Sequence, residues 1–183
     1  MKPEREPRTL ALAWRRENSA LLWSVAVIGL GLATALSAFV RLPLPFTPVP
    51  LTLQTMLVLL SGACLGAGAG AASQLVGLAL LWGSPQLLAA AAPGGLFGPT
   101  GGYLLAFAPA AWLVGRLGGR GWRLVAAMLV ADALILGVGT LQLSLVGGLP
   151  LGAALWAGTL PFVPGDLLKL ALAAGLVRGL RAC

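Results

Sequence analysis

Residues 42–115 read LPLPFTPVPLTLQTMLVLLSGACLGAGAGAASQLVGLALLWGSPQLLAAAAPGGLFGPTGGYLLAFAPAAWLVG, without a single Asp, Glu, Lys, Arg or His. A helix that crosses a bilayer needs about 20 apolar residues, so this stretch can hold three crossings and their turns. A soluble protein of 183 residues has no interior large enough to cover it. The stretch therefore predicts an integral membrane protein.

The flanking segments have the same character. Residues 18–40 are uncharged, and residues 124–177 carry only Asp132, Asp166 and Lys169. The chain is 58% hydrophobic and 9% charged, whereas soluble domains are about 25% charged. We predict an all-α membrane protein, with one six-helix transmembrane domain over residues 18–183 behind a cytoplasmic N-terminal arm, residues 1–17. The predicted spans are 18–40, 51–65, 67–83, 100–117, 123–146 and 151–180.

The positive charges predict the orientation in the membrane. Apart from Arg41 and Lys169 they form three groups before, between or at the ends of the spans: Lys2, Arg5, Arg8, Arg15 and Arg16; Arg116, Arg120 and Arg123; Arg178 and Arg181. Cationic loops stay in the cytoplasm, so the formal charge of +7 indicates topology rather than nucleic-acid binding. An even number of crossings must separate successive groups. Six crossings with both termini cytoplasmic satisfy this in a bacterial-type plasma membrane, with Arg41 alone on the far side.

Prolines and glycines divide the long uncharged stretch. Four prolines within residues 43–50 exclude a helix and predict a stiff apolar outer loop. This loop either folds back as a lid or rests at the headgroup boundary. Glycines between Gly62 and Gly70 mark the turn between spans two and three, and residues 84–99 form a second outer loop.

Enzyme chemistry has little support in this sequence. There is no His, no cluster of metal-ligating side chains and no Gly-x-x-x-x-Gly-Lys-Ser/Thr phosphate loop. We therefore expect no cofactor, no metal and no ATPase activity in this chain. Asp132 and Asp166 are conceivable as the acid pair of an intramembrane protease, but neither lies in a recognisable catalytic context.

Asp166 and Lys169 are the strongest candidates for a ligand site. They lie near the middle of the last predicted span, where a charge costs about 3 kcal/mol on insertion scales and usually faces a cavity. Their spacing of three places them on one helix face. Pro161 and Pro164 interrupt the helix just before them, which exposes backbone N–H groups. The alternative is a buried ion pair that only ties helices together.

Several weaker candidates accompany this pair. Thr100 can cap the start of span four, Gly101 allows close approach to a small molecule, and Tyr103 offers a flat apolar face. Gln54, Gln74, Gln142 and Asp132 suit interhelical hydrogen bonds as well as ligand contacts. Small residues at Gly29, Ala33 and Ser37 line one face of span one, which allows close helix packing.

Three segments together resemble a known family. Pro48-Val49-Pro50-Leu51-Thr52-Leu53-Gln54-Thr55, Gly98-Pro99-Thr100-Gly101-Gly102-Tyr103-Leu104 and Pro164-Gly165-Asp166-Leu167-Leu168-Lys169 occur in this order. They are similar to motifs of the BioY family, the biotin-specific S components of energy-coupling factor (ECF) transporters. The similarity extends from span one to the C-terminus.

The resemblance implies a six-helix S component that binds biotin with high affinity. It also implies that the chain docks on a transmembrane T component driven by two ABC ATPases, through a small-residue face corresponding to Gly29, Ala33 and Ser37. The implied ligand contacts are Asp166, Lys169, Tyr103, Thr100, Gly101 and Gln54. At residues 83–87 the chain reads Gly-Ser-Pro-Gln-Leu and departs from the family pattern, so Gln86 is expected to alter the lining. The alternatives are an S component for thiamine or riboflavin, or a structural membrane subunit without a ligand.

Overall fold

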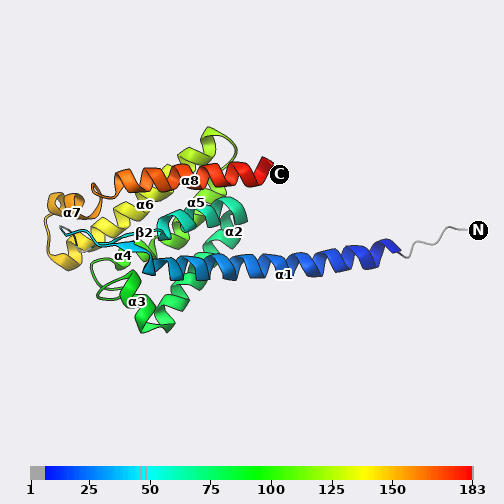
Figure 1. Ribbon diagram of the computed structural model, residues 1–183, viewed down its shortest axis with the longest axis horizontal. Helices are drawn as coiled ribbons and strands as arrows, with labels where there is room; N and C mark the ends of the chain where they lie inside the picture. The colour runs from blue at the N-terminus through cyan, green and yellow to red at the C-terminus, as the bar shows by residue number, and fades with distance from the viewer. Residues whose placement is uncertain (1–6, 46, 48, 183) are drawn as a thin grey trace, which may run out of the picture.

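The computed structural model describes residues 7–45, 47 and 49–182, and most of them are helical (Figure 1). The helices are α1 (Pro7–Leu36), η1 (Ser37–Phe39), α2 (Gln54–Gly83), α3 (Pro85–Ala91), α4 (Gly101–Leu105), α5 (Phe107–Leu117), α6 (Trp122–Gly147), α7 (Leu151–Gly158) and α8 (Val163–Ala182). Two short strands, β1 (Arg41–Leu42) and β2 (Leu51–Thr52), form an antiparallel ribbon.

By length and composition alone, three of the described helices could cross a membrane: Ala20–Phe39, Gln54–Gly83 and Trp122–Gly147. A fourth crossing can be built from Leu151–Gly158 and Val163–Leu180, which are bent by 48° at the break between them. Large apolar side chains such as Leu22, Leu145 and Trp156 are exposed on these segments. In the bilayer they face lipid, as a membrane protein requires.

Helix α2 is not a straight rod. Gly66 has φ 79° and ψ −178°, a backbone conformation outside the helical region. The Gln74 amide nitrogen donates a 2.9 Å hydrogen bond to the Ser61 hydroxyl, although 13 helical residues span about 20 Å. The chain therefore reverses at Gly66, and residues 54–65 and 67–83 pack side by side. The predicted turn between spans two and three lies at this glycine.

Other predicted boundaries need correction. The predicted helix 100–117 is divided into α4 and α5 around Ala106, because Pro109 lacks an N–H group and cannot bond the carbonyl of residue 105. The predicted span 151–180 is divided between Gly158 and Val163, beside Pro161, where the sequence predicted an interruption of the helix. The predicted outer loop 84–99 contains α3. Ser84 caps the start of this helix, because its hydroxyl accepts a hydrogen bond from the Leu87 N–H. Helix α1 begins at Pro7, within the predicted arm.

Close glycine contacts hold the bundle together. Gly31 of α1 faces the α2 backbone at Ser73 and Gly77, and Gly115 of α5 lies against the turn at Gly66. Such contacts allow helix backbones to approach closely in lipid. The buried core lies between α2, α5, α6 and α8 and includes Val58, Val114, Met128, Ile135 and Val177. The start of α1 and the end of α8 lie on the same side of the molecule (Figure 1).

Candidate functional site

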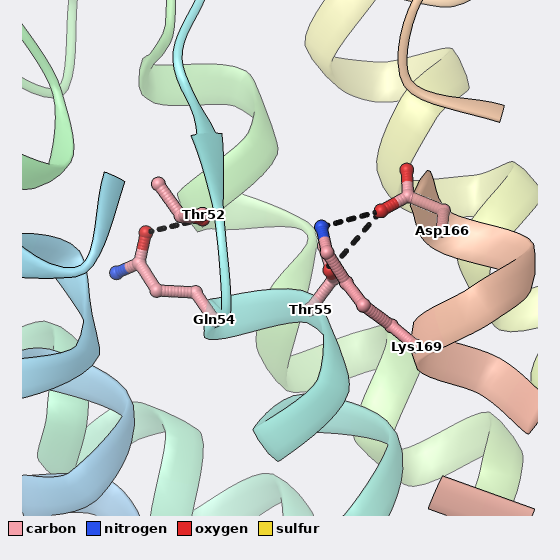
Figure 2. A network of polar contacts seen from close by, with 5 residues as sticks. All are labelled: Thr52, Gln54, Thr55, Asp166 and Lys169. Atoms are coloured by element: carbon pink, nitrogen blue, oxygen red, sulfur yellow. Dashed lines mark hydrogen bonds and ion pairs between the residues drawn. The ribbon is translucent and has the colours of Figure 1, made fainter. Parts of the chain in front are cut away.

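A polar network joins the start of α8 to the start of α2 (Figure 2). Lys169 Nζ lies 2.8 Å from Asp166 Oδ1 and donates to Thr55 Oγ1 at 3.2 Å. The Thr55 hydroxyl donates in turn to Asp166 Oδ1 at 3.3 Å. Asp166 and Lys169 are 3% and 7% exposed, so the network lies inside the bundle rather than on its surface.

The break before α8 positions this network. Asp166 lies in the first turn of α8, and its backbone N–H donates to the Phe162 carbonyl at 2.8 Å. A carboxylate in the first turn is stabilised by the positive end of the helix dipole. Lys169 follows one turn later on the same face. The proline break therefore brings the buried pair to a helix end, as the sequence predicts.

The network forms one wall of a cavity with about 490 Å³ of empty space, counted to its open mouth. The cavity is lined by Val49, Pro50, Thr52, Gln54, Thr55, Ala91, Thr100, Tyr103, Leu104, Phe107, Ile135, Leu136, Phe162, Asp166 and Lys169. Its other walls are apolar and aromatic, with a few polar side chains among them. This is the usual composition of a small-molecule site.

Two lining residues have unused hydrogen-bonding atoms. Gln54 is 2% exposed, and its Oε1 accepts from the Thr52 hydroxyl at 3.3 Å, but its Nε2 has no partner. Thr100 is 3% exposed, and its Oγ1 is also unpartnered; it makes no cap bond at the start of α4, so the capping prediction is wrong. A buried polar group without a partner costs about 1–3 kcal/mol. A ligand that bonded both atoms would recover this cost.

Tyr103 contributes its ring rather than a free hydroxyl. Its O–H donates to the Gly158 carbonyl at 2.7 Å, and the ring packs against Gly139 of α6. Nearby, the hydroxyls of Thr140 and Thr159 lie 2.7 Å apart. These bonds join the segment between α7 and α8 to α4 and α6.

Two predicted ligand residues lie outside the cavity lining. Gln86 is exposed on α3 and interacts with the Ser84 hydroxyl at 3.2 Å. Gly101 is buried against the backbone of Leu96, where a Cβ atom would overlap the carbonyl. Its small size therefore serves packing between α4 and the preceding loop.

The other polar candidates behave differently from one another. Gln74 bonds Ser61 across the α2 turn, and Gln142 donates to the carbonyls of Leu96 and Gly98 at 2.8 and 2.7 Å. Gln74 thus makes a bond between two helical arms, one of its two interpretations, whereas Gln142 ties α6 to the loop between α3 and α4. Asp132 is 8% exposed and its Oδ1 is unpartnered, but it does not line the cavity. No group of three or more His, Cys, Asp or Glu side chains in the described part of the chain could hold a metal ion.

The predicted docking face on span one is uneven. Gly29 is exposed with open space in front of it, Ala33 is half-buried, and Ser37 is buried in η1 with its hydroxyl donating to the Thr34 carbonyl at 2.8 Å. Only the first of the three is fully open to a partner helix.

Several lining residues were not among the predicted contacts. Thr55 bridges the charged pair, although the sequence marks it only as the last residue of the first motif. Phe107 and Phe162 supply aromatic walls, and no local sequence signal distinguishes them from other apolar residues. Val49 is 6% exposed and lines the cavity with Pro50. The end of the proline-rich loop therefore lies at the site, whereas Pro43 and Pro45 earlier in the loop are exposed.

Comparison with known proteins places the chain in a family. The BioY family model matches residues 14–183. The chain is 38% identical over 173 residues to the biotin transporter BioY of Rhodobacter capsulatus, covering 84% of this chain and 90% of the relative. It is 35% identical over 148 residues to the probable biotin transporter BioY of Bacillus subtilis, covering 73% and 75%.

A solved structure shares the fold. It is the crystal structure of the S-component for biotin from an ECF-type ABC transporter, with a TM-score of 0.79 and 28% identity. The similarity covers 91% of this chain and 94% of that chain. The family is one of plasma-membrane transporters rather than enzymes. The resemblance seen in the three sequence motifs is thereby confirmed, and the chain belongs to the BioY family.

Proposed function

We propose that this chain binds biotin in the cavity between α2, α4, α6 and α8, and mediates its uptake as the S component of an ECF transporter. The observation that carries the proposal is a buried charged network in the wall of an apolar cavity that is also lined by two residues with unpartnered polar atoms. Asp166, Lys169 and Thr55 form the network, and Gln54 Nε2 and Thr100 Oγ1 are the unpartnered atoms.

The chemistry of biotin suits these groups. Its ureido ring carries two N–H donors and one carbonyl acceptor, its thiophane ring is apolar, and its valerate chain ends in a carboxylate. Asp166 can accept from an N–H group, and Lys169 and Gln54 can donate to oxygen atoms. Phe107, Phe162 and the ring of Tyr103 offer apolar contact to the fused rings. We expect high affinity because the Asp166–Lys169–Thr55 network is already ordered by its own hydrogen bonds, which lowers the cost of ordering polar groups on binding.

We further propose six crossings with both ends in the cytoplasm. The two arms of α2 run in opposite directions, α4 and α5 together make one crossing, and α7 and α8 make another. The first arm, residues 54–65, is about 18 Å long, whereas the hydrocarbon core is about 30 Å thick. The extended chain before Gln54 must complete that crossing. Placing α1 and α8 with their free ends inside agrees with the cationic groups at 116–123 and near Arg178.

Energy for uptake has to come from partners. We propose a T component and two ABC ATPases, because the sequence holds no phosphate-binding loop. The open face at Gly29 of α1 is the proposed contact with the T component. Lipid surrounds the remaining apolar surface.

The test is titration of purified, ligand-stripped protein with biotin, thiamine and riboflavin, followed by calorimetry. One-to-one binding of biotin alone supports the proposal. Binding of thiamine or riboflavin instead would identify another vitamin S component. Failure of all three ligands to bind a protein that is still folded would favour a structural subunit without a ligand.

A further inference from the structure

Arg41 is a solitary charge at the cavity end of the molecule. Residues 18–40 and 42–115 contain no charged side chain, and neither do residues 133–165. The elements at this end, which are η1, the β1–β2 ribbon, α3 and α7, therefore carry Arg41 and no other charge. Among the described residues, the one ion pair is that of Lys169 with Asp166, so no carboxylate neutralises Arg41.

The guanidinium is exposed but held in place. One of its terminal nitrogens donates a 3.2 Å hydrogen bond to the Ala90 carbonyl at the end of α3. Arg41 also belongs to β1, where it pairs with Thr52 of β2. A guanidinium has five N–H donors. The single bond to Ala90 therefore fixes its position and leaves most of its donors available.

Two surface grooves meet at Arg41. One is lined by Val40, Arg41, Leu42, Leu51, Thr52, Leu53 and Lys169. The other is lined by Arg41, Pro43, Leu44, Thr47, Pro50 and Pro93. Both grooves are apolar apart from threonines and the two cations.

The first groove adjoins the binding cavity. Thr52 and Lys169 line both of them, and Pro50 is shared between the second groove and the cavity. Arg41 pairs across the ribbon with Thr52, which lines the cavity. An anionic amphiphile on the surface at Arg41 would thus lie next to the cavity wall that holds Lys169.

We propose that Arg41 is the outer capture residue for the ligand, attracting the carboxylate of biotin before the molecule enters the cavity; this rests on the proposed function. A single exposed cation beside apolar surface attracts an anion over about 8 Å at physiological ionic strength. A charge at the rim of a site mainly changes the association rate and its dependence on salt. The apolar groove accepts the rings while the guanidinium holds the carboxylate.

The experiment measures association and dissociation rates of biotin and of uncharged biotinamide on immobilised protein in neutral detergent. Arg41→Gln is expected to slow association of biotin by about threefold to tenfold. This is less than the factor of ~10 to 10³ by which a cleft lined with many like charges raises association rates. The dissociation rate of biotin from this variant stays within about twofold. Arg41→Lys retains fast association, and Arg41→Glu slows it further. Added salt reduces the difference between wild type and Arg41→Gln.

Controls separate charge from structure. Arg123→Gln removes an exposed arginine from α6, outside the cavity lining, and is expected to leave both rates unchanged. Biotinamide should associate equally fast with all variants. If Arg41→Gln slows biotin and biotinamide alike, or leaves biotin association unchanged, the proposal is overturned. If wild-type protein binds no biotin at all, the proposed function itself fails, and this inference with it.

Discussion

The Tyr103 hydroxyl on α4 donates a 2.7 Å hydrogen bond to the Gly158 carbonyl at the end of α7. The Tyr103 ring occupies the space in front of Gly139 on α6, where a larger residue would overlap it. One side chain therefore ties three helices together at the cavity wall. Because its hydroxyl already has an acceptor, we infer that Tyr103 holds the α7–α8 break in position and presents its ring to the ligand.

Removing this hydroxyl should affect stability more than binding. Tyr103→Phe leaves the Gly158 carbonyl without a donor, so the free energy of unfolding is expected to fall by about 1–2 kcal/mol. Biotin affinity should fall by less than about tenfold, equivalent to 1.4 kcal/mol. Thermal unfolding in detergent and calorimetric titration measure the two effects. A hundredfold loss of affinity with unchanged stability would show instead that the hydroxyl contacts the ligand.

The charged pair should matter most for binding. Asp166→Asn and Lys169→Met are each expected to weaken biotin binding at least about hundredfold, because charge-assisted hydrogen bonds to a buried ligand are lost. Each variant still folds, but Lys169→Met leaves a buried carboxylate without its cation and should lose about 3–5 kcal/mol of stability. Equilibrium binding and thermal unfolding of each variant provide the measurements.

The double variant separates the two roles of the pair. Asp166→Asn combined with Lys169→Met removes both charges, so it should be more stable than Lys169→Met alone. It should nevertheless fail to bind biotin tightly. Wild-type affinity in the double variant would mean that the pair only ties α8 to α2, which was the alternative interpretation from sequence.

The sequence predicted the membrane character and the buried pair because both depend on charge. An uncharged stretch as long as 42–115 can be accommodated only in a lipid bilayer. Charges as isolated as Asp166 and Lys169 need a polar cavity within it. Prolines and glycines also act locally, so the break before α8 and the turn at Gly66 could be placed. These features require no knowledge of the tertiary arrangement.

The remaining lining depends on packing between distant segments. No sequence signal separates Phe107 and Phe162 from other apolar residues. In a membrane protein the residues that face lipid and the residues that face the interior are both apolar. Thr55 becomes important only because α2 begins beside α8. Gln86 was expected near the ligand from its place after span three, but α3 directs it outward. Tertiary contacts decide which side of each helix points toward the cavity. In a uniformly apolar chain, the periodicity of the sequence does not reveal these contacts.

Substitutions at two glycines of α1 should distinguish helix packing within the protein from docking on the T component. Gly31→Leu would drive a side chain into the α2 backbone at Ser73 and Gly77, so it is expected to destabilise the isolated protein by several kcal/mol. Gly29→Leu points into open space and should leave stability and biotin binding unchanged. If the T component docks on this face, Gly29→Leu will reduce biotin uptake in cells that contain the complete transporter. Normal uptake with Gly29→Leu would exclude this position from the docking contact.

The reversal of α2 can be tested at Gly66. Its φ of 79° and ψ of −178° lie in a region essentially restricted to glycine. Gly66→Ala is therefore expected to destabilise the protein by about 1–3 kcal/mol, although no neighbouring atom blocks a Cβ there. The cost comes from backbone strain alone, and thermal unfolding of the purified variant measures it.

Gly68 provides the matched control two residues later. It is exposed, also has open space in front of it, and lies in the helical second arm of α2. Gly68→Ala should stabilise the protein by about 0.5–1 kcal/mol, because alanine favours the helix over glycine. Opposite signs at two neighbouring open glycines can arise only if the backbone turns at the first. If Gly66→Ala also stabilised the protein, α2 would have to continue as one helix, and the pairing of Gln74 with Ser61 would be lost.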